Sequence, residues 1–382
     1  MLISFDGFRW DYLEKTLTPN LDRFIATGVK AEALMPVFPT TTYPNHYTIV
    51  TGLYPTHHGL TANYVHDPAL GGYYHFATMD TGINHSQWWE AKPIWVTAEE
   101  AGLITASVFW PGSTVEFGGT QATYSLDPND RYKLSHEARI DQVLAGFDLP
   151  DNTRPRLITM YFPDTDVRGH QFGPESQTLA LTVRGLDYAM GYLFQGLEER
   201  GLMEEIDIII VSDHGMTQLS SERLIFLDDY IDIPTAGIIN WSTFLTLWPG
   251  EQIRNHVFAA LDGAHPALHM YRTETLPPRF HYQGHRRIPP ILGLIDEGWH
   301  IMITRAGYAA DPSQLVAGGH GYDPALRSMW GIFMARGPSF KSGLVVEPFQ
   351  NIHVYELIAH LLGVQPEPND GSLDEVKIML AE

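Results

Sequence analysis

Three short apolar segments that each run into aspartate constrain the fold of this chain more than any other feature. They are Met1 to Phe5 before Asp6, Leu157 to Phe162 before Asp164 and Asp166, and Ile206 to Val211 before Asp213. Near-continuous Ile, Leu and Val runs are typical of parallel strands that are covered on both faces. Because ligands of such sheets bind beyond the carboxyl ends of the strands, we expect Asp6, Asp166 and Asp213 to converge at one edge.

A long helical pattern separates the second and third of these segments. Apolar residues recur at three- and four-residue steps from Leu179 to Leu197, and Gly201 follows as the expected helix end. Strands alternating with helices indicate an α/β fold with a doubly wound, mostly parallel sheet and helices on both faces. From about residue 234 to residue 305 proline becomes dense and strand-like pieces are short, which indicates a small inserted α+β subdomain. We therefore expect a single domain over residues 1–382 with that insert.

Composition narrows the possible sites and partners. The chain has no cysteine, so any zinc ion would have to bind histidine and carboxylate. A net charge of -21 argues against a nucleic-acid polymer as partner, because such binding needs a face rich in lysine and arginine. No apolar run approaches the roughly 18 residues of a membrane span, so we expect no transmembrane segment. No signal peptide precedes the first strand, and we expect a mature or trimmed form.

Acidic residues and histidines gather at the expected strand ends and in glycine-containing loops. The set comprises Asp6, Asp166, His170, Asp213, His214 and His320. For any one member a structural role, such as a helix N-cap, is the simpler interpretation. The recurrence of strand ends and glycine neighbours favours a shared site. Three carboxylates and three imidazoles suit two ions with nitrogen and oxygen ligands, and two such ions can clamp both oxygens of an in-line displacement.

A candidate nucleophile lies in the segment Pro39-Thr40-Thr41-Thr42-Tyr43-Pro44-Asn45-His46. Pro44 in a first turn and Thr42 as N-cap predict that a helix starts here. A hydroxyl at a helix N-terminus meets free N–H groups and the positive end of the dipole, which would stabilise an attached phosphoryl group. Threonine needs a metal to lower its pKa before it attacks. The local sequence is equally compatible with a threonine that only caps the helix.

Several motifs, in order along nearly the whole chain, resemble the nucleotide pyrophosphatase/phosphodiesterase family of the alkaline-phosphatase superfamily. They are Phe5-Asp6-Gly7-Phe8-Arg9, Pro39 to His46, Thr51-Gly52-Leu53-Tyr54-Pro55, His58-Gly59-Leu60, Pro93-Ile94-Trp95-Val96-Thr97, Trp110-Pro111-Gly112-Ser113, Ser212-Asp213-His214-Gly215-Met216 and His320-Gly321-Tyr322-Asp323. The resemblance implies an alkaline-phosphatase-like fold and a bacterial-type single catalytic domain. It also implies a periplasmic or extracellular enzyme.

The resemblance further implies two zinc ions per chain. One would bind Asp166, His170 and His320, and the other Asp6, Asp213 and His214 with the Thr42 oxygen. Asp164 competes for the Asp166 position, but the family pattern places the acid four residues before the histidine, which favours Asp166. Thr42 would attack phosphorus in line and form a phosphothreonine intermediate. Asn63 would help to hold a phosphate oxygen.

The resemblance also implies a slot in which a nucleobase stacks. Its aromatic candidates are Tyr43, Phe76, Trp110, Tyr124 and Tyr161. Stacking accepts any base, at about 1–3 kcal/mol each. Core packing is the alternative, and it suits Trp110 best. The expected reaction is hydrolysis of nucleotides and nucleotide phosphodiesters to nucleoside 5′-monophosphates.

Two other functions stay open at the level of sequence. The first is a phosphodiesterase for glycerophosphocholine or a phospholipid headgroup with the same mechanism, since acidic and aromatic residues can cage a quaternary ammonium. The second is a catalytically silent binding protein on this fold, which would predict eroded ligands, whereas every expected ligand is present. The preferred base and the oligomeric state do not follow from the sequence.

Overall fold

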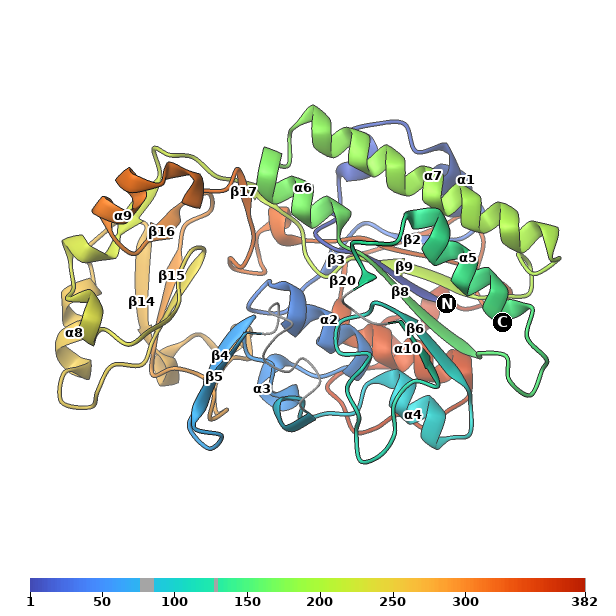
Figure 1. Ribbon diagram of the computed structural model, residues 1–382, viewed down its shortest axis with the longest axis horizontal. Coiled ribbons are helices and arrows are strands. Elements are labelled where there is room, and N and C mark those ends of the chain that lie inside the picture. The colour runs from blue at the N-terminus through green and yellow to red at the C-terminus, as the bar shows by residue number, and fades with distance from the viewer. Residues whose placement is uncertain (76–85, 127–129, 382) are drawn as a thin grey trace.

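The computed structural model describes residues 1–75, 86–126 and 130–381, and Figure 1 shows their arrangement. Within these residues, eight strands form the central sheet: β1 (Leu2–Phe5), β2 (Val29–Ala31), β6 (Thr105–Val108), β7 (Tyr124–Ser125), β8 (Leu157–Phe162), β9 (Ile208–Val211), β18 (Phe333–Arg336) and β19 (Leu344–Val346). Their order across the sheet is β19-β2-β18-β9-β1-β8-β6-β7. Strand β18 runs antiparallel to β2 and β9, and the other pairings are parallel. The predicted mostly parallel sheet is confirmed.

Helices cover both faces of this sheet, as predicted (Figure 1). On one face lie α1 (Pro19–Ala26), α5 (His136–Phe147), α6 (Asp164–Phe172) and α7 (Gln177–Glu199); on the other lie α2 (Thr42–Thr51), α3 (Pro55–His58), α4 (Ile94–Glu100) and α10 (Val354–Leu362). Neighbouring strand residues point to opposite faces. Ile3 and Ile210 therefore pack with α1, α5 and α7, whereas Leu2 and Ile209 pack with α2, α4 and α10.

The longest helix begins and ends where its sequence dictates. The hydroxyl of Ser176 caps α7 by accepting from the N–H of Leu179 at 3.1 Å. Its apolar stripe from Leu179 to Leu197 is buried against the sheet and against α5. Gly201 follows with φ +67°, the left-handed conformation that ends many helices.

A second, smaller unit lies beside the main sheet, on the left in Figure 1. Its antiparallel sheet has the order β12-β13-β15-β14, built from β12 (Ile238–Asn240), β13 (Phe244–Leu247), β14 (Leu268–Arg272) and β15 (Ile291–Ile295). Helix α8 (Arg254–Leu261) packs on it. These elements lie within the range 234–305 expected for an inserted subdomain, and the division of the chain at those boundaries remains a prediction.

Short two-stranded pairings complete the fold. They are β3 (Leu34–Met35) with β20 (Phe349–Gln350), β4 (Tyr64–Asp67) with β5 (Gly72–His75), β10 (Thr217–Gln218) with β17 (Gly318–Gly319), and β11 (Leu224–Phe226) with β16 (His300–Met302), which precedes α9 (Arg305–Ala310). Among residues 1–75, 86–126 and 130–381, no helix has both the length and the apolar character needed to cross a bilayer.

A buried arginine links the smaller unit to the hairpin of β4 and β5. Arg287 is 1% exposed, and its Nε donates to Asp67 Oδ2 at 2.6 Å. Its Nη1 donates to the carbonyl oxygens of Gly59 and Trp88 at 2.8 and 2.7 Å. Burial works to raise the pKa of Asp67, but hydrogen bonds from Arg287 and Arg286 outweigh it and lower the pKa to about 2. The hairpin is therefore held by a charged pair in the interior.

Candidate active site

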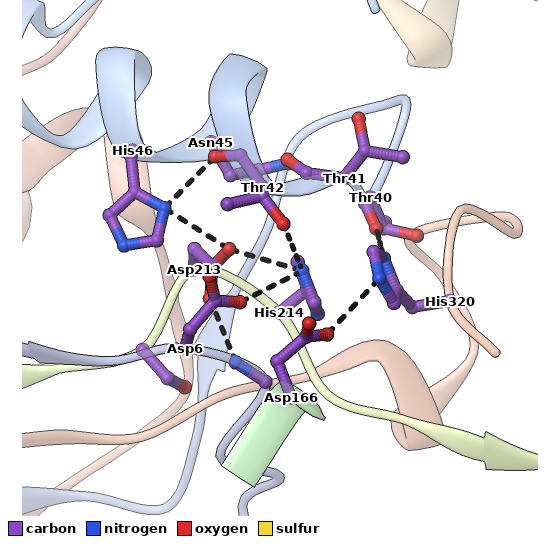
Figure 2. Close-up of polar contacts among 12 residues, drawn as sticks. Asp6, Thr40, Thr41, Thr42, Asn45, His46, Asp166, Asp213, His214 and His320 are labelled. Carbon is purple, nitrogen blue, oxygen red and sulfur yellow. Dashed lines mark hydrogen bonds and ion pairs between the residues drawn. The ribbon is translucent and has the colours of Figure 1, made fainter. Parts of the chain in front are cut away.

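The carboxyl ends of three neighbouring strands bring the predicted acidic residues together. Asp6 follows β1, Asp213 and His214 follow β9, and α6 starts directly after β8 with Asp166 and His170 on it. His320 follows β17, which pairs with β10 just beyond His214. Figure 2 shows Asp6, Asp166, Asp213, His214 and His320 pointing toward one another below the start of α2. The expected convergence at one sheet edge is therefore observed.

The first set of potential ligand atoms comes from Asp166, His170 and His320. His170 Nε2 lies 3.1 Å from His320 Nε2, and both nitrogens lie 3.3 Å from Asp166 Oδ1. Atoms at about 2.0–2.1 Å from a tetrahedral zinc ion are about 3.3–3.4 Å apart. The triangle therefore has the spacing of three ligands around one such ion.

The second set comes from Asp6, Asp213 and His214. His214 Nε2 lies 3.1 Å from Asp213 Oδ2 and 3.5 Å from Asp6 Oδ1. The Thr42 hydroxyl oxygen is 3.3 Å from the same nitrogen (Figure 2). Asp166, His214 and His320 also have ligand atoms within 4.8 Å of one another, and the rings of His214 and His320 stack at 3.6 Å. His214 thus lies between the two sets.

The hydrogen bonds of the three histidines fix which ring nitrogen faces the cluster. The Nδ1 atoms of His170, His214 and His320 lie 2.8, 2.8 and 2.9 Å from the carbonyl oxygens of Gly318, Gly215 and Thr40. A carbonyl only accepts, so each Nδ1 carries a proton and each Nε2 is the nitrogen that faces the cluster. Backbone carbonyls orient metal-binding histidines in this way.

Buried carboxylate oxygens in the cluster lack hydrogen-bond donors. Asp6 Oδ1, Asp166 Oδ1 and Asp213 Oδ2 are buried without a hydrogen bond. Burial and the neighbouring carboxylates of Asp213 and Asp166 raise the pKa of Asp6 well above its usual value. Divalent cations would reverse this repulsion and satisfy all three oxygens. The residues therefore fit two cations with nitrogen and oxygen ligands.

Protons and metal compete for the same nitrogens. Burial lowers the pKa of His170, but the carboxylate of Asp166 outweighs it and raises the pKa to about 9. Burial and the neighbouring His214 lower the pKa of His320 to about 4. A cation that binds His170 Nε2 would displace the proton that the Asp166 carboxylate favours on this ring.

Helix α2 begins one residue earlier than predicted, which changes the role of the Thr42 hydroxyl. The N-cap is Thr41, in extended backbone, and its side chain makes no capping hydrogen bond. Thr42 is the first helical residue, so its hydroxyl does not cap the helix and instead faces His214 Nε2. The prediction of Thr42 as N-cap was wrong by one position. The shift leaves the hydroxyl at the positive end of the helix and next to the candidate ligands.

Two further predicted residues are located clearly by their hydrogen bonds. Asn63 lies beside the nucleophile candidate, since its Oδ1 accepts from the backbone N–H of Tyr43 at 3.0 Å. Its amide NH2 is the group left to donate to a ligand. Asp164 instead pairs with His136 at 3.0 Å, whereas Asp166 faces His170 and His320. This arrangement favours Asp166 over Asp164 as the metal ligand.

Three of the aromatic candidates are buried near the cluster, and their contacts differ. Tyr161 is 6% exposed and donates its hydroxyl to Asp6 Oδ2 at 2.5 Å, so it contacts a candidate ligand directly. Tyr43, next to Thr42, is also buried, at 5% exposure. Trp110 is 1% exposed and packs its ring edge-on against His46 at 5.2 Å. Trp110 is therefore a core residue beneath the site, the alternative that its sequence context suited best.

The remaining aromatic candidates are not brought to the cluster. Tyr124 lies on the edge strand β7, is 39% exposed, and donates its hydroxyl to the carbonyl of Thr153. Thr153 precedes β8, so this hydroxyl points toward the edge of the sheet opposite the strand ends that carry the aspartates. Phe76 lies outside the described residues.

His46 supports the cluster in a way that was not predicted from the sequence. This residue is fully buried on α2, four residues after Thr42, and its Nδ1 lies 3.2 Å from Asp213 Oδ2. Gly7 was also missed: its backbone N–H donates to Asp213 Oδ1 at 3.1 Å. The four-residue spacing between Thr42 and His46 was a usable signal, because such residues lie on the same side of a helix.

Comparisons with known proteins agree with this geometry. The family model described as type I phosphodiesterase / nucleotide pyrophosphatase matches residues 1–323. The chain is 38% identical to human ectonucleotide pyrophosphatase/phosphodiesterase family member 5 over 381 residues, which cover 100% of this chain and 77% of the relative. It is 36% identical to human bis(5′-adenosyl)-triphosphatase over 387 residues, covering 100% of this chain and 82% of that protein.

Solved structures of members of this family also match the chain. Murine family member 5 superposes with a TM-score of 0.94 at 37% identity, covering 100% of this chain and 99% of that one. An inactive threonine-to-alanine variant of that murine protein, in complex with AMP, matches equally well. These matches confirm the alkaline-phosphatase-like fold expected from the sequence. The chain belongs to the type I phosphodiesterase/nucleotide pyrophosphatase family of hydrolases.

Proposed function

We propose that this enzyme hydrolyses nucleotides and nucleotide phosphodiesters to nucleoside 5′-monophosphates, with Thr42 as nucleophile beside two zinc ions. The observation that carries the proposal is the position of the Thr42 hydroxyl, 3.3 Å from His214 Nε2 among six convergent ligand candidates. This hydroxyl is also at the N-terminus of α2, where the helix dipole favours negative charge.

The residues proposed to hold the metal form two sets. Asp166, His170 and His320 would bind one zinc ion, and Asp6, Asp213 and His214 would bind the other together with Thr42. Zinc is the ion we favour, because the donors are imidazoles and carboxylates with near-tetrahedral spacing. When bound, the two ions supply positive charge that stabilises the attacking and leaving oxygens of the displacement.

The chain's own groups would orient the reaction. Thr42 Oγ1 would attack phosphorus as the opposite bond to the leaving oxygen breaks, which gives a phosphothreonine that still carries the nucleoside. Water would then cleave the Thr42–phosphorus ester, release the nucleoside 5′-monophosphate and restore the Thr42 hydroxyl. Asn63 is held by the Tyr43 N–H through its Oδ1, so its NH2 group is directed to donate to a non-bridging phosphate oxygen. Burial of Asp6, Asp213 and His214 excludes bulk water from this side of the site and strengthens these interactions.

A nucleotide substrate is supported by the relatives. The murine relative was solved in complex with AMP, and a human relative is named for its action on a bis(5′-adenosyl) triphosphate. Tyr43 and Tyr161 remain our candidates for contact with the nucleoside, because both lie at the cluster. The comparisons do not favour glycerophosphocholine or a phospholipid headgroup. The name of family member 5 carries the prefix "ecto", which supports a location outside the cytoplasm.

The test is hydrolysis by the purified, zinc-loaded protein. We expect cleavage of a p-nitrophenyl nucleoside 5′-monophosphate ester and of a dinucleoside polyphosphate, with much slower turnover of glycerophosphocholine. The Thr42→Ala variant should lose activity by several orders of magnitude and keep its zinc. The matched control is Thr41→Ala, because the Thr41 hydroxyl makes no hydrogen bond. Full activity in Thr42→Ala, or failure of the wild type on both nucleotide substrates, would contradict the proposal.

A further inference from the structure

His46 occupies a fully buried position that joins three elements of the site. It lies on α2 one turn after Thr42, and its side chain is 0% exposed. Nδ1 lies 2.9 Å from the carbonyl oxygen of Thr42 and 3.2 Å from Asp213 Oδ2. On the other side of the ring, Nε2 lies 2.8 Å from the hydroxyl of Ser4 on β1. Figure 2 shows the ring beside Thr42 and Asp213.

The neighbours of the ring determine where its proton is. The carbonyl oxygen of Thr42 and a carboxylate oxygen of Asp213 only accept, so Nδ1 must carry the hydrogen. The hydrogen bond is made to the carbonyl, and Asp213 Oδ2 is an electrostatic contact at the same N–H. Ser4 then donates its hydroxyl to the lone pair of Nε2. The tautomer of the neutral ring is fixed by these groups together.

Aromatic rings hold the imidazole in this orientation. Trp110 and Tyr161 each meet its ring edge-to-face, with centroids 5.2 Å away and interplanar angles of 77°. Tyr161 also donates to Asp6, so the same aromatic residue contacts both His46 and a candidate ligand. The ring cannot turn without disturbing Ser4, Trp110 or Tyr161.

We propose that His46 is a positioning residue, which aims the Asp213 carboxylate at the metal cluster and ties it to the residue that carries the nucleophile. The Asp213 carboxylate has two supports, the Gly7 N–H on Oδ1 and the His46 N–H beside Oδ2. Oδ2 is also the atom that faces His214 Nε2 at 3.1 Å. Loss of the His46 N–H leaves this oxygen free to rotate away from the ion. Partners of this kind change metal affinity or activity by about 10–100-fold when they are removed.

This inference rests on the proposed two-metal function, and a pair of amide variants tests it. In His46→Asn the amide nitrogen occupies the place of Nδ1, so an N–H toward Thr42 and Asp213 is retained. In His46→Gln the longer side chain carries its amide to the place of Nε2, next to Ser4, and the N–H toward Asp213 is lost. The two variants have the same functional group, so they separate the hydrogen bond from the loss of an aromatic ring.

The measurements are zinc affinity, by competition with a chelating dye, and kcat and KM on a p-nitrophenyl nucleotide ester. We expect His46→Gln to lower zinc affinity and kcat about 10–100-fold with little change in KM, and His46→Asn to stay within a few-fold of wild type. His58→Asn is the matched control: it removes another fully buried imidazole, whose Nε2 lies 3.1 Å from the Thr48 hydroxyl, and should leave zinc affinity unchanged.

Equal losses of zinc affinity and kcat in the two His46 variants, or wild-type zinc affinity in His46→Gln, would overturn the proposal. If His46→Gln does not fold, His46→Leu serves instead, because it keeps an apolar side chain between Trp110 and Tyr161 and offers no N–H to Asp213. Unchanged zinc affinity in that variant would count against the proposal. A wild-type protein that binds zinc and cleaves no nucleotide ester would refute the proposed substrate, while the order of zinc affinities would still test His46.

Discussion

Tyr161 donates its hydroxyl to Asp6 Oδ2 over 2.5 Å, so a residue expected to stack on a nucleobase also supports a candidate metal ligand. Removal of the hydroxyl oxygen alone therefore tests the support of Asp6 separately from stacking by the ring. Burial and the nearby carboxylate of Asp6 raise the pKa of Tyr161 well above its usual value, so the hydroxyl stays protonated and able to donate.

Tyr161→Phe removes this donor and keeps the ring. We expect zinc affinity to fall about 10-fold, with KM for a nucleotide ester changed less than 3-fold, because the apolar surface remains. Chelator competition and steady-state kinetics measure both. Tyr192→Phe is the control, since its hydroxyl donates to Asp141 at the surface. A large rise in KM with normal zinc affinity would show that the hydroxyl acts on substrate instead.

Asp166→Asn and Asp164→Asn form a matched pair that tests the assignment of the first metal set. Asp166 faces His170 and His320, whereas Asp164 pairs with His136. We expect the zinc content of Asp166→Asn to fall from about two ions per chain to about one, with activity reduced at least 100-fold. Asp164→Asn should retain both ions. Elemental analysis of the purified variants gives the number of zinc ions per chain. A lower zinc content in Asp164→Asn than in Asp166→Asn would refute the assignment.

Gly7→Ala should damage both the fold and the cluster. Gly7 has φ +65°, and a Cβ there would lie 2.9 Å from the Cα of Asp166. We expect a loss of about 2–4 kcal/mol of stability, from strain and displaced backbone, together with weaker zinc binding. Gly71→Ala is the control: its φ is +69°, yet nothing lies within 4 Å of the added carbon. Thermal unfolding compares the two, and equal losses would mean that the contact with Asp166 has no cost.

The buried pair of Asp67 and Arg287 predicts a loss of stability in acid. The pKa of Asp67 is lowered to about 2 in the folded chain, against an unfolded value near 3.8. The contribution of the Asp67 carboxylate to stability is therefore complete above pH 3.8 and disappears as the pH falls toward 2. The difference between the two pKa values corresponds to about 2 kcal/mol of the free energy of unfolding.

Denaturant unfolding of Asp67→Asn between pH 7 and pH 3 measures this contribution. At pH 7 the variant should lose about 3–5 kcal/mol, because Arg287 is left buried with only part of its partners. The difference from wild type should narrow as the pH falls below 3.8. Asp374→Asn, which affects an exposed pair with Lys377, should change stability by less than about 1 kcal/mol. A pH-independent difference for Asp67→Asn would contradict the linkage.

Local sequence patterns were sufficient for the framework of the fold. Strand β8 spans Leu157–Phe162 as predicted, β1 and β9 differ from prediction only at their starts, and α7 contains the expected stripe from Leu179 to Leu197. Each of these elements is buried along its length, so the spacing of its apolar residues in the sequence indicates both its type and its extent. The six ligand candidates followed from strand ends and glycine-containing loops, which the sheet brings together by topology.

The parts that were missed depend on contacts between distant segments. His46 meets Ser4 and Asp213, and Tyr161 meets Asp6, across separations of 42 residues or more. No local period encodes such contacts. The N-cap is Thr41 and not Thr42 because the extended backbone before α2 ends one residue earlier than predicted, a difference that cap preferences do not resolve. Tyr124 illustrates the same difficulty, since only the sheet order reveals that it lies on an edge strand.

The ligand candidates are spread from Asp6, near the start of the chain, to His320, near its end, and this spacing has a consequence for biosynthesis. A ribosome delivers Asp6 first, and His320 follows 314 residues later. During that interval Asp6, Asp166 and Asp213 emerge without the imidazole that completes the first set. The proposed metal sites can therefore be completed only after His320 has emerged. Cotranslational folding of the sheet must accommodate uncompensated carboxylates until then.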